Sequence, residues 1–327
     1  MTYELKGFAD VPDYIYGITR AIWEDRGVGG RLDDYYAADI NVRAPTGLTH
    51  GNGGVVAQTL ATLHQFPDRQ LVGEDVIWTP APDRSFLSSH RLISVMHHTG
   101  DGALGQATGA RVVSRIIADC WVQDGKVKEE WLARDQAAFA RCLGTTPAAL
   151  ARASLADDAR AGRPPTFFTP ASDRPSRYQP VVADDPAVRR LVEGYQRLWT
   201  VKETAVIRDL YFAGATLHPP GGEPRHGHLD IDRWVIGYLA AFPDAEWSVH
   251  SATIRRDPEQ SVRVALRWAI SATHSGYGQF GPPSGAPVYL MGFTHAHLTE
   301  ERIIAEWTVI DEVAVWKQIL AAGGATD

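Results

Sequence analysis

Residues 300–311 read EERIIAEWTVID, and residues 124–135 read DGKVKEEWLARD. Each stretch contains the dipeptide Glu-Trp and ends on aspartate, and 300–311 lies 176 positions after 124–135. The same spacing joins Trp23 to Trp199, Tyr35 to Tyr211, His50-Gly51 to His226-Gly227, Phe66-Pro67-Asp68 to Phe242-Pro243-Asp244, and His98 to His274. Because chance does not produce this many matches at one spacing, the sequence predicts one domain that is encoded twice.

A proline-rich segment separates the two copies. At 327 residues the chain is longer than a usual single domain, so two domains are expected. The segment 144–186 is interrupted by Pro164, Pro165, Pro170, Pro175 and Pro180. Its alanine-rich part, 147–160, is typical of a short helix, and the rest is typical of an extended linker. We therefore predict a first domain over 1–143, a linker over 144–186 and a second domain over 187–327.

Composition excludes several classes of protein. The net charge of −7 argues against a nucleic-acid partner, which needs a dense basic surface. No stretch approaches the roughly 20 apolar residues that cross a bilayer, so no membrane partner is expected. Cys120 and Cys142 are the only cysteines, which favours a cytoplasmic location. The absence of a Walker loop and of G-x-S-x-G and H-E-x-x-H motifs argues against P-loop enzymes, serine hydrolases and zincins.

Each copy has helical patterns first and strand patterns afterwards. Apolar residues recur at helical spacing over 15–23 and 53–66, and over 188–199 and 231–242. Alternating patterns favour strands over 71–78, 86–96, 107–122 and 127–135, and over 247–254, 262–273, 288–298 and 303–311. This order is typical of an α+β fold in which N-terminal helices pack on an antiparallel sheet.

The final strand of each copy brings an acid next to an indole. Because side chains alternate along a strand, Trp307 and Asp311 are expected on one face, with Glu306 and Thr308 on the other. A carboxylate among apolar side chains is poorly solvated, which raises its pKa toward the range useful for proton transfer. Asp311, and Asp135 in the first copy, are therefore candidate catalytic residues. The alternative is that each aspartate caps the helix that follows it.

Histidine is concentrated in the second copy. Four of its histidines form pairs two residues apart, His226 with His228 and His295 with His297. On a strand such a pair shares one face and suits a metal, but no set of cysteines or carboxylates accompanies it. We expect no metal and keep the metal site as an alternative. His274, which repeats His98, is the better candidate for a pocket group that orients a carbonyl or carries a proton.

Three motifs of the second copy resemble a known family. They are Phe-Pro-Asp at 242–244, the loop Gly-Pro-Pro-Ser-Gly at 281–285 after His-Ser-Gly, and the stretch 300–311. Together they are similar to the SnoaL-like polyketide cyclase family of the nuclear transport factor 2-like superfamily, over 188–320 and more loosely over 11–143. The resemblance implies two tandem cone-shaped α+β domains, each with a curved antiparallel sheet around a deep apolar pocket.

The resemblance also implies an activity and a site. Cyclases of this family close a ring by intramolecular aldol condensation without metal or cofactor, using an aspartate that matches Asp311 or Asp135 here. His274 would stabilise the enolate oxygen. We assign to the pocket walls Trp307, His295, His297 and Tyr211 in the second copy, and Trp131 and His98 in the first.

The functional hypothesis is a cofactor-independent acid/base enzyme, of the cyclase, isomerase or hydrolase kind, for a small apolar carbonyl compound. The alternative is a non-catalytic protein of the same fold that binds a small molecule or serves as a scaffold. Family cyclases are usually single domains that pair as dimers, so the two copies here are expected to form an internal pseudo-dimer, and a homodimer stays open. The first copy lacks Pro282-Pro283, which favours the second copy as the working site.

Overall fold

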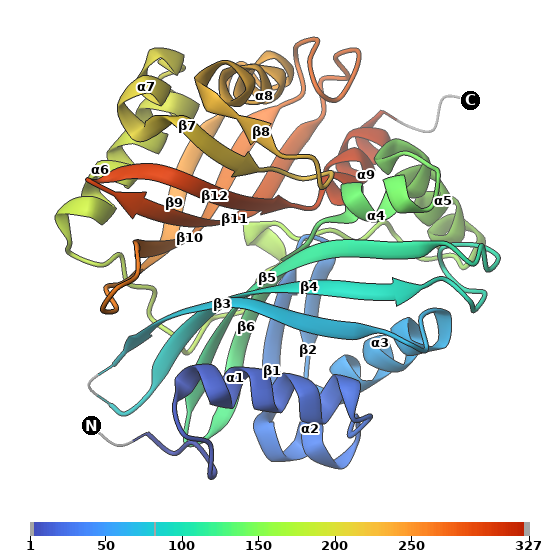
Figure 1. Cartoon of the computed structure of the whole chain (residues 1–327). Helices are drawn as coiled ribbons and strands as arrows, with labels where there is room; N and C mark the ends of the chain where they lie inside the picture. The colour runs from blue at the N-terminus through green and yellow to red at the C-terminus, as the bar shows by residue number, and fades with distance from the viewer. Residues whose placement is uncertain (1–2, 82, 324–327) are drawn as a thin grey trace. The chain divides into compact units, whose positions relative to one another are not determined.

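The chain folds into two compact units. The computed structural model describes residues 3–81 and 83–323. One unit is made of 1–146 and 166–179, and the other of 147–165 and 180–327. Each holds a six-stranded sheet with its own helices, so the chain consists of two tandem α+β domains, as the sequence predicts (Figure 1). The segment 144–186, predicted as a linker, is divided between the two units.

The first unit begins with helices and continues mainly with strands. Its helices are α1 (Val11–Thr19), α2 (Gly30–Tyr35), α3 (Asn52–Gln65) and α4 (Gln136–Cys142), with a π-helical turn at Arg20–Glu24 and a 3-10 turn at Pro170–Ser172. Its strands are β1 (Tyr36–Ala44), β2 (Gly47–His50), β3 (Gln70–Pro80), β4 (Phe86–His97), β5 (Arg111–Gln123) and β6 (Lys126–Arg134).

The second unit repeats this order and adds the helix from the linker. Its helices are α5 (Pro147–Arg160), α6 (Pro186–Tyr195), α7 (Ile207–Leu210), α8 (Gly227–Ala241) and α9 (Glu312–Ala322), with short turns at Gln196–Thr200 (π-helical) and Thr204–Val206 (3-10). Its strands are β7 (Tyr211–His218), β8 (Arg225–His226), β9 (Glu246–Arg255), β10 (Val262–Thr273), β11 (Pro287–Thr299) and β12 (Arg302–Ile310). An ion pair of 2.7 Å between Asp158 and Lys317 joins α5 to α9.

Both sheets have one topology. The strand order is β2-β1-β6-β5-β4-β3 in the first unit and β8-β7-β12-β11-β10-β9 in the second. Neighbouring strands are antiparallel except for β1 with β6 and β7 with β12, which are parallel. The sheets are therefore mixed, where the sequence analysis expected antiparallel ones. A parallel pair forms because a helix and several strands separate its members along the chain, which provides the long connection that parallel neighbours need.

The spacing of 176 positions holds through most of the two sheets. β4, β5 and β6 begin 176 positions before β10, β11 and β12. The first strand departs from it: Tyr36 lies opposite Val127, whereas Tyr211 lies opposite Ile303. The structural counterpart of Tyr211 is therefore Tyr36, and the sequence match with Tyr35 is wrong by one residue. The connection that leads into this strand is one residue shorter in the second copy.

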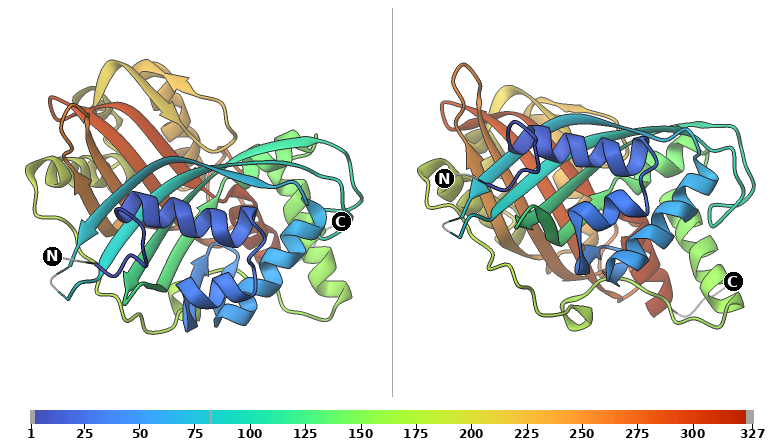
Figure 2. Two further views of the ribbon diagram at one scale, coloured as in Figure 1. Left: turned by 60° about the horizontal axis from the view of Figure 1, so that its bottom comes forward. Right: turned by 90° about the horizontal axis from the view of Figure 1, so that it is seen from below.

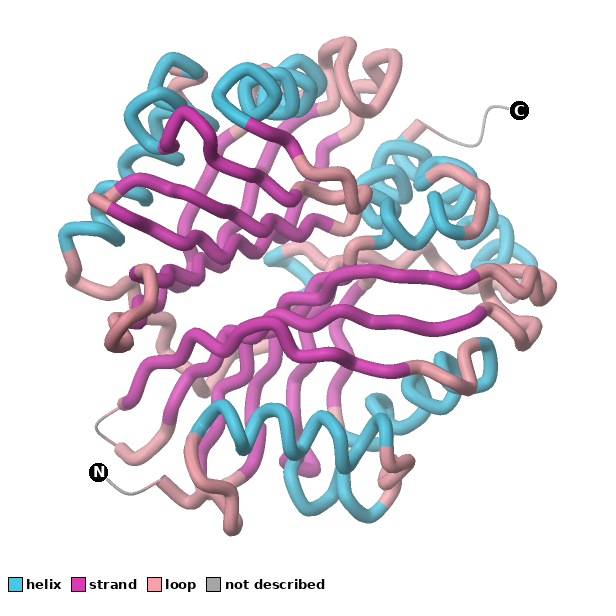
Figure 3. The backbone as a smooth tube through the Cα atoms, in the orientation of Figure 1, coloured by secondary structure: helices cyan, strands magenta, loops and turns pink. Residues whose placement is uncertain are grey.

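Helices cover one face of each sheet. In α6 the apolar side chains of Val188, Leu191 and Tyr195 are spaced to share one side of the helix, and all three are buried. Asp185 begins this helix by accepting a hydrogen bond from the Ala187 N–H. Figures 2 and 3 show the corresponding arrangement of α1, α2 and α3 on one face of the first sheet. None of the described helices is long and apolar enough to cross a membrane.

Buried ion pairs fasten the segment 166–179 to the first unit. Arg43 and Glu129 are fully buried, and their side chains pair at 2.7 Å. Asp173 accepts from the Arg43 Nε at 2.5 Å, and the Arg177 backbone N–H donates to Glu129 at 3.1 Å. Removing either partner of a buried ion pair leaves a charge without compensation, which is strongly destabilising. This half of the linker is therefore an integral part of the first unit.

The two repeated aspartates both cap helices. The Asp135 carboxylate accepts from the Ala138 N–H at 2.9 Å at the start of α4. The Asp311 carboxylate accepts from the Ala314 N–H at 3.0 Å at the start of α9. Both residues are buried. The structure thus contains the helix-cap role that the sequence analysis gave as the alternative.

We expect Asp311→Ala to lower the free energy of unfolding by about 1 kcal/mol, since it removes the acceptor at the helix N-cap. Thermal unfolding followed by circular dichroism measures this loss. Asp311→Asn is the matched control, because asparagine caps helices about as well as aspartate. A variant Asp311→Asn that unfolds like the wild type but loses activity would instead assign Asp311 a part in the chemistry.

Candidate active site

A cavity lies in the second unit, between its sheet and the helices α6 and α8. Its wall consists of Tyr195, Leu198, Trp199, Tyr211, Trp234, Val235, Trp247, Trp268, Thr294, Glu306 and Thr308. The strand residues come from β7, β9, β10, β11 and β12, so nearly the whole sheet contributes to the wall. The cavity volume is about 10 Å³, which is room for about one water molecule. A larger ligand therefore requires side chains of the wall to move.

Glu306 is the acidic group of this cavity. Among the described residues that line it, no other has an ionisable carboxyl or basic side chain. The Tyr195 and Tyr211 hydroxyls donate to Glu306 Oε2 at 2.8 and 2.5 Å, and the Thr308 hydroxyl donates to Oε1 at 2.6 Å. The Glu306 residue is only 3% exposed. Three hydroxyls thus fix the carboxyl group in one orientation inside an apolar wall.

The hydrogen-bonded chain extends from Glu306 across the sheet. The Thr308 and Thr294 hydroxyls lie 2.8 Å apart, and the Trp268 Nε1–H donates to Thr294 at 3.0 Å. An indole nitrogen can only donate, so Thr294 accepts from Trp268. Thr308 gives its single hydroxyl proton to Glu306, so between the two threonines Thr294 is the donor. The network is therefore arranged for an acceptor at Glu306, which a carboxylate provides.

Burial and hydrogen bonding act in opposite directions on Glu306. Burial raises the pKa of its carboxyl above the usual value, whereas the hydrogen bonds from Thr308, Tyr211 and Tyr195 lower it. The net direction is upward. Burial also raises the pKa of both tyrosines well above the usual value, so they remain proton donors at neutral pH. A carboxyl shifted toward neutrality is suited to exchange a proton with a substrate.

The alternation of side chains along β12 explains why Glu306 occupies the cavity. Glu306 and Thr308 face inward, so Trp307 faces the opposite side of the sheet. There the Trp307 ring stacks on His218 at 5.2 Å and contacts His297 at 4.7 Å between ring centroids. The expectation that Trp307 and His297 form the wall of this cavity is therefore corrected. The two faces were separated correctly, but the cavity lies on the other one.

His274 and His98 hold loops. The His274 Nδ1 lies 3.0 Å from the Ser284 hydroxyl, and its backbone pairs with residues 284–286 at the end of the Gly-Pro-Pro-Ser-Gly loop. His98 has the same arrangement, with Nδ1 at 3.2 Å from the Thr108 hydroxyl. Both histidines are fully buried, and neither lines the cavity. Burial lowers the pKa of His274, which favours its neutral form.

The other expected site residues are dispersed. Tyr211 lines the cavity, whereas Asp311 lies at the start of α9, outside the wall. His295 is fully buried on β11 next to Thr294, whose side chain faces the cavity, so alternation turns His295 to the opposite side. In the first unit Trp131 contacts the Tyr178 ring at 5.9 Å, which places it against the segment 166–179.

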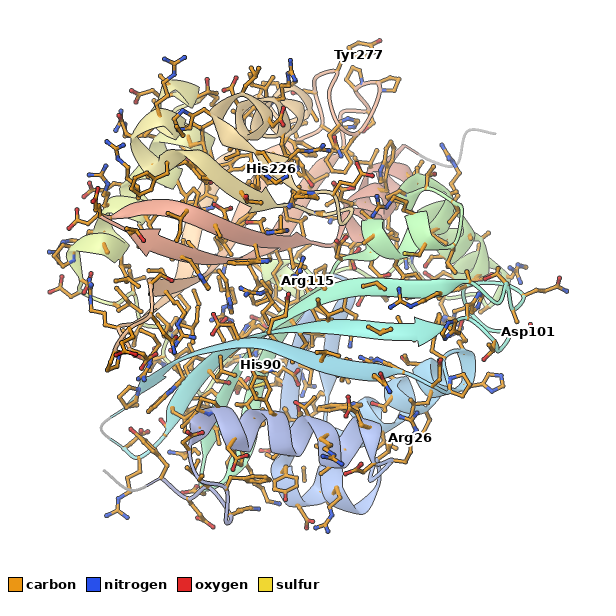
Figure 4. All side chains as sticks on the ribbon, viewed as in Figure 1. Arg26, His90, Asp101, Arg115, His226 and Tyr277 are labelled. Atoms are coloured by element: carbon orange, nitrogen blue, oxygen red, sulfur yellow. The ribbon has the colours of Figure 1, made fainter. Side chains whose placement is uncertain are left out.

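The paired histidines of the second copy make local contacts. His226 on β8, labelled in Figure 4, has its Nδ1 at 3.2 Å from the Thr216 hydroxyl. The His228 Nε2 lies 2.9 Å from the Tyr211 carbonyl oxygen. Among the residues that the structure describes, no group of three or more His, Cys, Asp or Glu side chains is arranged to hold a metal ion.

Sequence reasoning missed Glu306 as the site carboxyl, although a signal was present. Glu130 and Glu306 belong to the repeated Glu-Trp dipeptide, so the acid before the tryptophan recurs as faithfully as the aspartate after it. Periodicity assigns alternate residues to two faces, but it does not say which face is covered by helices.

Comparison with known proteins places the cavity within a recognised domain. The family model of SnoaL-like polyketide cyclases matches residues 189–319, and no curated protein matches the chain. Similar solved structures include IdmH, a candidate polyketide cyclase from Streptomyces antibioticus, at 23% identity over 43% of this chain and 100% of that chain, with a TM-score of 0.35. A candidate SnoaL-like polyketide cyclase from Jannaschia sp. CCS1 has 20% identity over 44% of this chain and 99% of that chain, with a TM-score of 0.36.

A candidate polyketide cyclase from Acidithiobacillus ferrooxidans has 22% identity over 43% of this chain and 99% of that chain, with a TM-score of 0.37. All residues of the cavity wall lie inside the matched range 189–319. The first unit has the sheet topology of the second. The second copy is therefore similar to SnoaL-like polyketide cyclases over 189–319, and the chain consists of two tandem α+β domains with one sheet topology.

Proposed function

We propose that the second copy is a cofactor-independent acid/base enzyme of the cyclase or isomerase kind, which acts on a small apolar carbonyl compound in the cavity around Glu306. The observation that carries the proposal is one buried carboxyl group, held by three hydroxyls, in a wall that is mostly aromatic. The SnoaL-like family includes cyclases and isomerases, which supports an enzyme of this general kind.

The two protonation states of Glu306 supply the chemistry. In the neutral form the carboxyl group donates its proton to the carbonyl oxygen of the substrate. The carboxylate that remains accepts a proton from the adjacent carbon, which yields the enol and restores the neutral carboxyl group. Tyr195 and Tyr211 hold one carboxyl oxygen and Thr308 holds the other, so the group is oriented before the substrate arrives. An enol formed in this way is the nucleophile for an isomerisation or for ring closure.

The first copy has the same carboxyl group, but most of the residues around it differ from those around Glu306. Glu130 occupies the position of Glu306, and Tyr36 is hydrogen-bonded to it as Tyr211 is to Glu306. Four other site residues, Tyr195, Trp268, Thr294 and Thr308, are replaced by Thr19, Leu92, Ala118 and Leu132, all of them buried. Three of the replacements belong to the apolar core of the first unit. These differences favour the second copy as the site of activity.

We expect Glu306→Gln to slow proton transfer at least about a hundredfold, because the amide neither donates an acidic proton nor accepts one as a base. The assay is the exchange of α-protons of small cyclic ketones in D₂O, followed by proton NMR. Glutamine has the size of glutamate, so the melting temperature should be close to that of the wild type.

Glu130→Gln is the matched control and should leave the exchange rate unchanged. The proposal fails if Glu306→Gln exchanges as fast as the wild type, or if the wild type accelerates no ketone of the panel. A protein that binds such ketones without exchange would support the alternative of a non-catalytic binding protein.

The first copy gives a prediction about stability and pH. Burial raises the pKa of Glu130 from 4.5 to about 7. The folded state therefore binds this proton more tightly than the unfolded state. The resulting stabilisation is complete below pH 4.5 and is lost as the pH rises to about 7. Relative to Glu130→Gln, the wild type should lose up to about 3 kcal/mol over this interval.

Urea unfolding of wild type and Glu130→Gln at a series of pH values measures this difference. Parallel stability curves for the two proteins would show that the Glu130 carboxyl titrates alike in the folded and unfolded states, against the expectation. Glu130→Asp is a useful second variant, because it keeps the titrating group.

A further inference from the structure

A continuous run of aromatic rings lines the Glu306 cavity. We call this run the aromatic wall; in order, its members are Tyr195, Trp247, Trp268, Trp199 and Trp234. The centroids of successive rings are 5.8, 6.5, 6.5 and 5.9 Å apart. Each ring therefore contacts the next, from the end of α6 through β9 and β10 to α8.

The cavity wall has groups that attract a cation and, among the described residues, no basic side chain that would repel one. The face of an aromatic ring carries partial negative charge, and an indole face attracts cations more strongly than other side-chain rings do. Glu306 adds a carboxyl group, and none of the described residues of the cavity wall is Lys, Arg or His. The site therefore offers a cation a set of aromatic rings and a carboxyl group.

The hydrogen-bond donors of the site donate to other side chains of the protein. The Tyr195, Tyr211 and Thr308 hydroxyls donate to Glu306, and the Trp268 indole donates to Thr294. Stabilising a negative oxygen on a ligand requires donors that point at the ligand. These donors are already used by the carboxyl network, so the arrangement favours a ligand with positive charge over an oxyanion.

The fold does not require the aromatic wall. The positions that correspond to its members in the first copy are Thr19, Leu71, Leu92, Trp23 and Gln58. Only one of these is aromatic, yet the first sheet has the same strand order as the second. Packing of the sheet against the helices is thus achieved without the rings. Their concentration around Glu306 is a property of the site.

We propose that this cavity takes a substrate whose reacting part carries a positive charge, of the alkylammonium class, between the aromatic wall and the Glu306 carboxylate. The inference rests on the proposed function, because it takes this cavity as the substrate site, and it changes the substrate from a wholly apolar carbonyl compound to one that also carries an alkylammonium group. With an ammonium group beside the reacting carbonyl, the Glu306 carboxylate takes the proton from the carbon next to the carbonyl, which gives the enolate and the neutral carboxyl group, and the positive charge of the substrate stabilises the enolate. In the proposed complex the methyl groups of the substrate's ammonium group contact the aromatic rings, and its positive charge lies near the Glu306 carboxylate.

A ligand of the alkylammonium class requires the cavity to widen. The volume of about 10 Å³ is too small for a trimethylammonium group. Trp199, Trp247 and Trp268 are at most 4% exposed, whereas Trp234 on α8 is only partly buried. A partly exposed ring loses less buried surface on moving than a fully buried one, so Trp234 is the member of the wall that we expect to move when a ligand enters.

Binding of choline and of 3,3-dimethylbutan-1-ol tests the proposal. The two molecules have the same shape, but only choline carries a charge. Isothermal titration calorimetry of the full chain, above neutral pH, should show choline binding at least about tenfold more tightly than the alcohol. The proposal is overturned if the alcohol binds as tightly as choline, or if neither molecule binds.

Two variants locate the binding site. Trp268→Leu introduces the residue that the first copy has at position 92, and Glu306→Gln removes the charge without changing the size. Each should weaken choline binding at least about tenfold and change binding of the alcohol much less. Glu130→Gln is the control and should bind choline like the wild type. Choline binding that is unchanged in both site variants would place the cation elsewhere and overturn the assignment.

Failure of this inference is distinguishable from failure of the proposed function. Loss of ketone exchange in Glu306→Gln with no preference for choline would leave the acid/base enzyme standing and reject the cationic substrate. Preference for choline without any exchange of ketone protons would leave the cationic ligand standing and reject the acid/base enzyme.

Discussion

In each unit the last strand lies parallel to the first, and the rest of the site depends on this pairing. In the second unit Ile303 lies opposite Tyr211, at the start of β7. This register brings the Tyr211 hydroxyl to within 2.5 Å of the Glu306 carboxyl, three residues further along β12. The same pairing in the first unit places Tyr36 against Glu130. A strand pair formed between the two ends of a domain thus determines the position of its buried carboxyl group.

Burying a carboxyl group costs free energy, and the groups around it decide how much of this cost is offset. Around Glu306 the cost is offset by three hydroxyl donors and by a hydrogen-bonded chain that ends on an indole. Around Glu130 most of this network is replaced by apolar residues. Two copies of one domain therefore share the acid and differ in what the acid can do. In the second copy the Glu306 carboxyl faces a cavity. In the first copy, most of the positions that correspond to the residues around Glu306 are occupied by residues of the apolar core.

The two halves of the segment between the copies belong to different units. Its segment 166–179 completes the first unit through Arg43 and Glu129, and its helix α5 joins the second unit through Asp158 and Lys317. Each half thus has its own ionic contacts, the first with residues of β1 and β6 and the second with α9. A proline-rich composition indicated a connecting segment, but the ion pairs involve residues far apart in the sequence. They were therefore beyond what local patterns predict.

The sequence by itself determined the duplication, the α+β order of elements, the helix after each last strand, and the resemblance of the second copy to a known family. These are local or repeated patterns, readable as spacing and periodicity. Tertiary structure decided the parallel strand pair, the match of Tyr211 with Tyr36, and the choice of Glu306 over Asp311 as the carboxyl in the cavity. Alternation separates the two faces of β12, but only the helices packed on one face make it the inside. That packing brings together residues distant in the chain, which is why the sequence identified the strand and the structure identified the side chain.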